Sequence, residues 1–105
     1  MIIVLALTEN HIKSPIDIHF GRCDWYCIYN SENSEKKIIE NLYRNENDQA
    51  GCKSAEMLLK EYNIQLAVAG RFGSKVVAFF KENHVQMVII EEQKTMNEIL
   101  KLLRK

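Results

Sequence analysis

The pattern of apolar residues divides the chain into a first part with strand spacing and a second part with mainly helical spacing. Ile2–Leu7 is almost wholly apolar, which is typical of a strand buried on both faces. Trp25–Asn30 is rich in aromatic and β-favouring residues, and with residues 37–43 it predicts two further strands joined as a hairpin. The second strand would present two sets of side chains: Trp25, Cys27 and Tyr29 on one face, and Tyr26 and Ile28 on the other.

Three later segments carry the signals of helices. The first has apolar residues at helical spacing: Ala55, Leu58, Leu59 and Tyr62. Asn47 or Asp48 is the expected N-cap of this helix, and Ser74 is the expected N-cap of the second. Thr95 and Glu98 have the spacing of a capping box, which predicts that the last helix begins there.

Short apolar runs at residues 65–69 and 85–90 alternate with these helices and predict two more strands. Residues 60–68 resemble residues 81–89, and each copy contains a helix end, a tight turn and a buried strand. Consecutive units of this kind pack as a parallel sheet with right-handed crossovers. The pattern therefore predicts a single α/β domain in the order βββαβαβα, with a mixed five-stranded sheet and helices on both of its faces.

Length and charge narrow the class of protein. A chain of 105 residues is expected to form one domain, residues 1–105. Lys plus Arg and Asp plus Glu number 14 each, so overall charge gives no indication of nucleic-acid binding. No apolar run approaches the ~20 residues of a membrane span, and the N-terminus lacks the charged region of a signal peptide. We expect a cytoplasmic protein that does not enter a membrane.

The cysteines do not predict a disulfide framework, because there are three of them and no repeated C-x-x-C motif. Cys27 lies in the middle of a predicted strand and is expected in the core. Cys23 follows a predicted loop and Cys52 lies at a predicted helix start, where thiols are commonly reactive. Either of these two could instead be a small buried hydrophobic residue, which is the usual role of a free cysteine.

Candidate binding residues gather at one predicted edge of the sheet. Strand directions place residues 19–23, 51–53, 71–75 and 91–94 together at the carboxyl edge, where ligands of open α/β sheets bind. His19 and Cys23 are possible metal ligands, and Gly21 is expected to allow a tight turn between them. Two helix N-termini and several cations at this edge favour an anionic ligand. The cations are Arg22, Lys53, Arg71 and Lys75, with Lys94 as a further candidate.

The motif His19-Phe20-Gly21-Arg22, the short aromatic strand after it and the Ala-Gly-x-x-Gly turn at residues 69–73 resemble the dinitrogenase iron–molybdenum cofactor biosynthesis family. That family includes small carriers of nitrogenase cofactor precursors. The resemblance implies a ribonuclease H-like topology with the first strand central, and it makes His19 a stronger candidate ligand. Relatives commonly have a glycine where this chain has Arg71, which could narrow the site or supply a cation.

Two functional hypotheses follow. In the first, the chain is a binding protein that transiently carries an iron–sulfur or iron–molybdenum–sulfur cluster for metallocluster assembly proteins. In the second, it is a regulatory or interaction module that binds an anionic metabolite or a partner protein. Enzyme activity is not expected, because the carboxylates that a ribonuclease H-like nuclease needs are scattered. The candidate cofactor-binding residues are His19, Gly21, Arg22, Cys23, Cys52, Gly70, Arg71, Gly73 and Ser74, with His19 and Cys23 as metal ligands.

Overall fold

The structure is a computed structural model that describes residues 1–46 and 50–103. Its elements are β1 (Ile2–Leu7), β2 (Trp25–Asn30), β3 (Glu35–Glu40), α1 (Ala50–Tyr62), β4 (Leu66–Ala69), α2 (Ser74–Glu82), β5 (Gln86–Ile89) and α3 (Met96–Leu103). The predicted order βββαβαβα is confirmed. The candidate caps Asn47 and Asp48 lie outside the described residues.

The described strands form one mixed sheet in the order β3-β2-β1-β4-β5, so β1 is central as predicted. β1 pairs antiparallel with β2, with Val4 opposite Ile28, and parallel with β4, with Val4 opposite Ala67. β2 and β3 form the predicted hairpin, and β4 pairs parallel with β5. This is the mixed sheet of the expected ribonuclease H-like topology.

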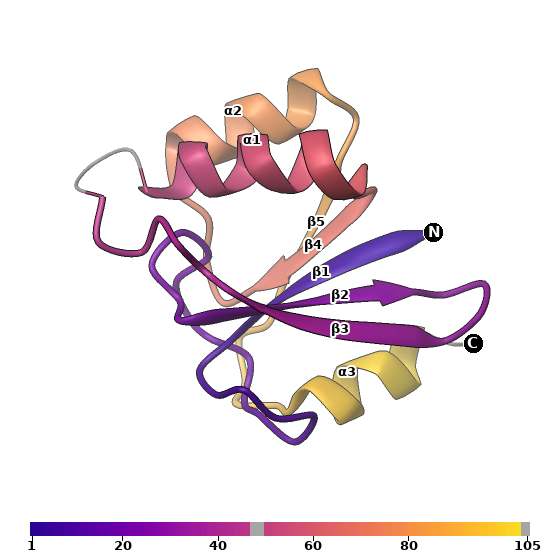
Figure 1. The fold of residues 1–105 in the computed structure, drawn as a ribbon. Coiled ribbons are helices and arrows are strands. Elements are labelled where there is room, and N and C mark those ends of the chain that lie inside the picture. The colour runs from indigo at the N-terminus through magenta and orange to yellow at the C-terminus, as the bar shows by residue number, and fades with distance from the viewer. Residues whose placement is uncertain (47–49, 104–105) are drawn as a thin grey trace.

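Helices cover both faces of the sheet, with α1 and α2 on one face and α3 on the other (Figure 1). Because side chains alternate along a strand, β1 sends Val4 toward α1 and α2 and sends Leu5 toward α3. β2 divides as predicted, with Tyr26 in the first core and Cys27 in the second. The sheet therefore separates two apolar cores.

The third strand begins and ends earlier than the predicted range 37–43, and Asn41 explains where it ends. The backbone N–H of Asn41 donates to the carbonyl oxygen of Asp24 (2.9 Å), and its side chain turns inward to the loop before β2. Pairing with β2 therefore stops at Glu40. Leu42, which resembles a strand residue in the sequence, is 76% exposed.

The boundaries of the later strands and helices lie closer to the predicted ones than those of β3 do. β4 and β5 are each shorter than the predicted ranges 65–69 and 85–90. The predicted cap at Ser74 is wrong, because Gly73 is the N-cap of α2 and no side chain caps it. The capping box is confirmed, since Thr95 N–H donates to Glu98 Oε1 (3.0 Å) and Glu98 N–H donates to Thr95 Oγ1 (3.3 Å).

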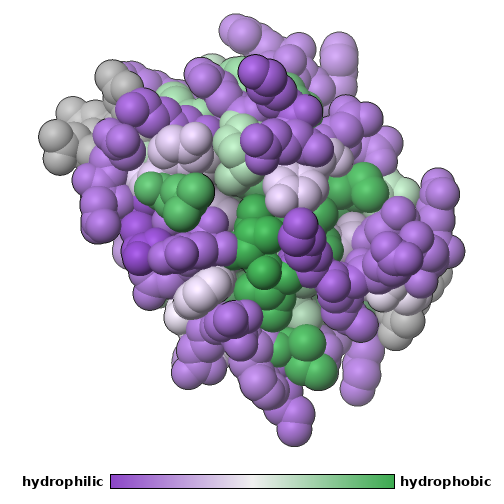
Figure 2. Space-filling model, viewed as in Figure 1, coloured by the Kyte–Doolittle hydropathy of each residue, from purple (hydrophilic) through white to green (hydrophobic). Residues whose placement is uncertain are grey.

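One hydrophobic band crosses the face that shows β3 and α1, and hydrophilic side chains flank it (Figure 2). A shallow groove between β3 and α1 includes Ile39, Leu42 and Met57 in its lining. This groove lies apart from the candidate binding residues, which gather at the end of the sheet where β1 and β4 finish.

Candidate functional site

The connection between β1 and β2 reaches the carboxyl end of β4 and pairs with it there. Arg71 N–H donates to the carbonyl oxygen of Ile18 (2.7 Å), and Phe20 N–H donates to the carbonyl oxygen of Arg71 (3.3 Å). A Cβ atom on Gly70 would lie 2.6 Å from Ile18 Cα, so this contact requires glycine. The sequence places Gly70 among the binding residues, but its role in the structure is to bring two backbone segments together.

A second glycine contact brings the same loop against α1. A Cβ atom on Gly21 would lie 2.5 Å from Gly51 Cα, and one on Gly51 would lie 2.7 Å from Val76 Cγ2 in α2. Neither glycine has a positive φ angle. The chain turns at residues 20–22 as expected, but the close approach to Gly51, rather than a positive φ angle, is what requires glycine at position 21. These two contacts draw the loop and the first turns of α1 and α2 around one hollow.

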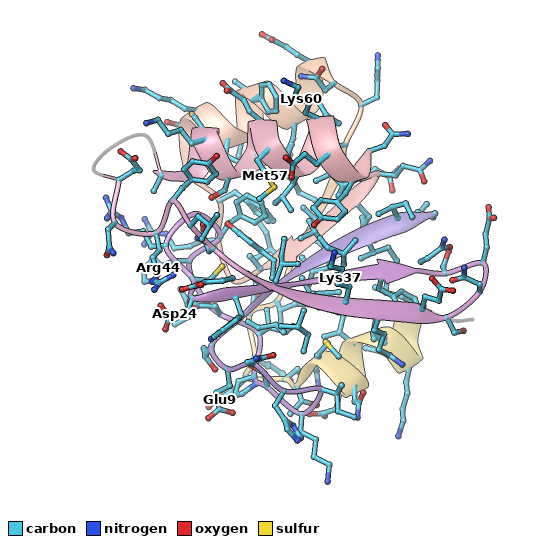
Figure 3. All side chains as sticks on the ribbon, in the orientation of Figure 1. Glu9, Asp24, Lys37, Arg44, Met57 and Lys60 are labelled. Atoms are coloured by element: carbon cyan, nitrogen blue, oxygen red, sulfur yellow. The ribbon has the colours of Figure 1, made fainter. Side chains whose placement is uncertain are left out.

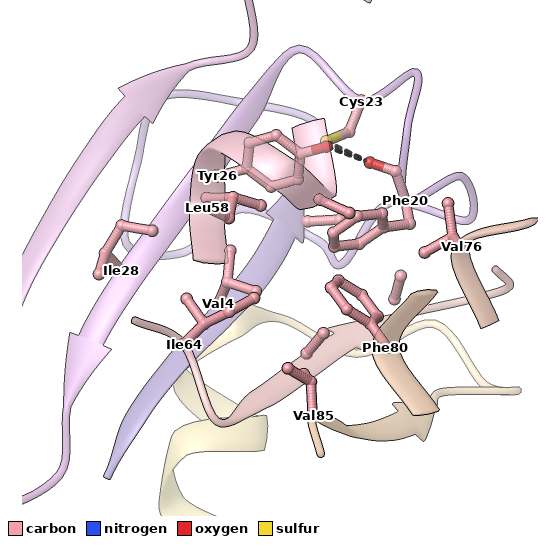
Figure 4. Close-up of a cluster of buried hydrophobic side chains, with 14 residues drawn as sticks. Val4, Phe20, Cys23, Tyr26, Ile28, Leu58, Ile64, Val76, Phe80 and Val85 are labelled. Carbon is pink, nitrogen blue, oxygen red and sulfur yellow. Dashed lines mark hydrogen bonds between the residues drawn. The ribbon is translucent and has the colours of Figure 1, made fainter. Parts of the chain in front are cut away.

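Phe20 anchors the loop in the core below that hollow. Its side chain is buried, and its ring centroid lies 5.2 to 5.4 Å from those of Tyr26, Phe72 and Phe80. The Tyr26 hydroxyl donates to the carbonyl oxygen of Phe20, and so does the Cys23 thiol, whose Sγ lies 3.3 Å away (Figure 4). With Phe20 held on both sides, the neighbouring residues His19 and Gly21 are fixed at the surface.

The hollow, which we call the rim pocket, has a volume of about 420 Å³. Its lining comes from residues 19–22, from residues 50–52 in the first turn of α1, and from residues 71 and 73–76 at the start of α2. Arg22, Arg71 and Lys75 contribute three positive charges, whereas no described lining residue is an Asp or Glu. The N-termini of α1 and α2 add partial positive charge. A chain with no net charge thus has a pocket suited to an anion.

Among the described residues that line the pocket, His19 and Cys52 are able to coordinate a transition metal. The His19 side chain is 56% exposed, and its Nδ1 lies 3.9 Å from Asp17 Oδ1. Asp17 Oδ1 also accepts a hydrogen bond from the backbone N–H of His19 (2.9 Å). Among residues 1–46 and 50–103, no group of three or more His, Cys, Asp or Glu side chains is placed to hold a metal ion. The described site therefore offers one or two metal ligands rather than a closed cage.

Cys23, expected beside His19 as a second metal ligand, is placed differently. Its side chain is 1% exposed and belongs to the core under α1 and α2. Burial is the main cause that raises the pKa of its thiol, to about 12, so the thiolate needed for metal binding is disfavoured. Cys27 is in the core as predicted, and burial raises its pKa to about 11.

Part of the predicted edge also lies elsewhere. Residues 91–94 follow β5 and contact the α3 side, where the Lys94 carbonyl oxygen accepts a hydrogen bond from Ile16 N–H (2.8 Å). Lys53 pairs with Glu46 (3.4 Å) and Lys94 pairs with Glu92 (3.7 Å). The structure thus brings together His19, Gly21, Arg22, Cys52, Arg71, Gly73 and Ser74 from the candidate set.

Asn41 supports the loop of the pocket from the core side, and the sequence pattern does not predict this role. Its amide group donates to the carbonyl oxygens of Gly21 (2.9 Å) and Cys23 (2.8 Å). An isolated Asn at the end of a predicted strand carries no signal of this role. The only hint is that a polar residue interrupts the apolar pattern of the range 37–43.

The resemblance to the dinitrogenase cofactor family extends over the whole chain. The family model described as dinitrogenase iron-molybdenum cofactor matches residues 1–105. The chain belongs to this family. An uncharacterized protein of Methanocaldococcus jannaschii is 35% identical over 85 residues, which cover 78% of this chain and 68% of that protein.

Two solved structures share this fold over nearly the whole length of the chain. The apo form of the orange protein from Desulfovibrio gigas matches with a TM-score of 0.88 and 16% identity, over 97% of this chain and 85% of that one. A Thermotoga protein of the DUF35 family matches with a TM-score of 0.82 and 18% identity, again over 97% and 85%. At these identities the likeness shows the fold alone, while family membership associates the chain with the nitrogenase cofactor. None of the helices formed by the described residues has the length and hydrophobicity needed to cross a bilayer.

Proposed function

We propose that this family member is a binding protein that transiently carries an iron–sulfur or molybdenum–iron–sulfur cofactor precursor in the rim pocket. The observation that carries the proposal is the composition of that pocket, which combines His19 and Cys52 with three cations and has no carboxylate among its described lining residues. Metallocluster assembly proteins would supply the precursor and accept it. In this proposal the chain binds and releases its cargo and catalyses no reaction.

The charge of the pocket suits such a cargo. Clusters rich in sulfide carry negative charge, and Arg22, Arg71 and Lys75 would offset it at close range. Arg71 lines the pocket, which favours its role as a supplied cation. The N–H groups at the start of α2, which no side chain caps, add hydrogen-bond donors for an anion.

The small number of ligands suits release. A structural metal site usually closes four ligands around the ion, whereas a carrier must give up its cargo. A neutral imidazole such as that of His19 coordinates metals at physiological pH. Asp17 Oδ1 lies 3.9 Å from Nδ1 of the His19 ring, and in this proposal Nε2 is the atom that binds the cluster.

The proposal is tested by anaerobic reconstitution with iron and sulfide, with and without molybdate, followed by gel filtration and visible absorption. His19→Ala should remove most of the retained chromophore and leave the melting temperature nearly unchanged, because the ring is largely exposed. His84→Asn is the matched control. His84 is exposed in the turn before β5 and has φ 59°, a conformation that Asn tolerates.

Arg22→Ala should reduce retention partly, and the difference from the parent should shrink at high salt, because salt screens the charge that Arg22 contributes. If the His19→Ala protein keeps the chromophore as well as the parent does, His19 is not the ligand. If the parent keeps no chromophore but binds inorganic phosphate in competition with sulfate, the pocket serves an anionic metabolite instead. That second candidate rests on the same cations and helix N-termini.

A further inference from the structure

Asn41 is a fully buried polar residue whose hydrogen-bonding capacity is completely used. Its Nδ2 donates to the carbonyl oxygens of Gly21 (2.9 Å) and Cys23 (2.8 Å). Its Oδ1 accepts from Ser54 Oγ (3.0 Å) and from Tyr43 N–H (3.0 Å). An amide offers two donor hydrogens and two acceptor lone pairs, so these four short hydrogen bonds fix its orientation, and the Tyr26 hydroxyl lies at a longer 3.5 Å from Nδ2.

Apart from Tyr43, the residues that these short hydrogen bonds join to Asn41 belong to the loop before β2 and to α1, two of the segments that form the rim pocket. Gly21 lines the pocket and touches Gly51 in the first turn of α1. Ser54, also fully buried, lies one turn further along the same helix. Asn41 therefore joins the loop to α1 on the core side of the Gly21–Gly51 contact.

The backbone of Asn41 is held as firmly as its side chain. Its N–H donates to the carbonyl oxygen of Asp24 (2.9 Å), and its own carbonyl oxygen accepts from Arg44 Nη1 (2.8 Å). Arg44 also pairs with Asp24 (3.5 Å) and Glu40 (3.0 Å), and it lies beside Asp24 at the end of the sheet (Figure 3). The backbone of Asn41 is thus fixed to the hairpin of β2 and β3, and no residue of these two strands lines the rim pocket.

From this geometry we propose that Asn41 is a positioning residue of the rim pocket. It holds the carbonyl groups of residues 21 and 23 toward the core and fixes the loop against α1, so that His19 and Arg22 face the ligand. An apolar residue would fill the same space without the desolvation of an amide, but it could not hold two carbonyl groups. The ligand in this proposal rests on the proposed function, whereas the position of the loop can be measured without any ligand.

The decisive variant is Asn41→Asp, which keeps the size and one acceptor oxygen but replaces the NH2 donor with a carboxylate oxygen. The carbonyl oxygens of Gly21 and Cys23 then lose their donor and face a negative charge. Leu100→Ala is the control for a general loss of stability, because Leu100 is buried in the other core. The free protein is labelled with a thiol reagent, and each cysteine is quantified by mass spectrometry.

The cysteines report separately on the loop and the sheet. Cys23 lies in the loop, while Cys27 lies in β2 and faces the α3 core. In Asn41→Asp the thiol reagent should label Cys23 about tenfold faster than in the parent, because the lost hydrogen bonds ease local opening of the loop. The labelling rate of Cys27 should change much less. In Leu100→Ala the labelling of Cys23 should not be accelerated more than the labelling of Cys27. Equal acceleration of both cysteines in Asn41→Asp, or none, would overturn the proposal.

A second measurement addresses the ligand. With iron and sulfide as the probe, Asn41→Asp should retain severalfold less chromophore than Leu100→Ala at a temperature where both proteins are folded. If the parent protein retains none, the proposed function fails while the cysteine measurement still decides the role of Asn41. If Asn41→Asp frees Cys23 but retains the chromophore as the control does, Asn41 supports the loop without positioning the ligand, and the proposal is wrong.

Discussion

The two faces of the sheet share the central strand β1 but differ in the interactions that hold their cores together. On the α3 face the core is largely aliphatic, and a capping box sets the start of the helix. On the α1 and α2 face the core contains the aromatic group around Phe20, a buried amide at Asn41 and two close glycine contacts. Within the core of the first face side-chain packing dominates, and the capping box and the hydrogen bond from Ile16 N–H to the Lys94 carbonyl oxygen fix the segment that leads into α3. The second combines packing with backbone contacts and hydrogen bonds, and the rim pocket lies at its edge.

Removing a large side chain from each core should give the largest effects and separate the two faces. Leu58→Ala and Leu100→Ala both delete buried side chains and should each lower the free energy of unfolding by ~2–5 kcal/mol in urea titrations. Only Leu58→Ala should also weaken chromophore retention among folded molecules, because Leu58 belongs to α1, whose first turn lines the pocket. Equal loss of retention in both variants would show that the faces are not independent.

Glycine substitutions sharpen the comparison within the pocket face. Gly21→Ala should lower the free energy of unfolding by ~1–3 kcal/mol and impair binding, because its Cβ would lie 2.5 Å from Gly51 Cα and force the backbones apart. Gly73→Ala is the control, since a Cβ there meets nothing within 4 Å. It should cost at most about 1 kcal/mol as a change of N-cap residue. Thermal melts that rank the two variants in the opposite order would refute the close-contact explanation.

Alkaline pH should lower the free energy of unfolding through one buried thiol in each core. The pKa is raised from 9.0 to about 12 for Cys23 and to about 11 for Cys27. Because the unfolded chain loses these protons first, stability is complete below pH 9 and falls as pH rises, by ~1.4 kcal/mol per pH unit for each thiol. Burial also raises the pKa of Tyr26, and Cys23 adds to that rise, so Cys23→Ala should reduce the Tyr26 contribution as well, whereas Cys27→Ala should leave it in place.

Urea titrations under reducing conditions at several alkaline pH values measure this dependence. Cys23→Ala should flatten the fall in stability up to about pH 12, and Cys27→Ala should flatten it only up to about pH 11. The same dependence in the parent and both variants would mean that neither thiol is held neutral by the fold.

The sequence predicts the fold well because periodicity records which residues are buried. The apolar run of β1, the alternation of β2 and the repeated helix–strand units are sufficient for the order of elements and for two covered faces. Boundaries are harder where a side chain overrides local preference. Leu42 and Tyr43 resemble strand residues, but the inward turn of Asn41 ends β3 before them.

The site is predictable only in part, because its residues meet through tertiary contacts. His19, Arg22 and Arg71 are recognisable from the motif and the direction of the strands, and all three line the rim pocket. The burial of Cys23 is not recognisable, since the sequence does not reveal that its thiol turns to the Phe20 carbonyl oxygen. The contact of Gly21 with Gly51 joins segments thirty residues apart, and no local pattern encodes it.

The smallest expected effect tests whether the α3 face is truly separate from binding. Thr95→Ala removes the cap of α3 and should lower the free energy of unfolding by about 1 kcal/mol without changing chromophore retention. Hydrogen bonds from Thr95 lower the pKa of Glu98, so this stabilisation is present at neutral pH and is lost as pH falls through the lowered pKa. The difference between parent and variant in urea should therefore shrink in acid. If Thr95→Ala instead reduced retention as much as His19→Ala does, the α3 face would take part in binding and the contrast between the two faces would fail.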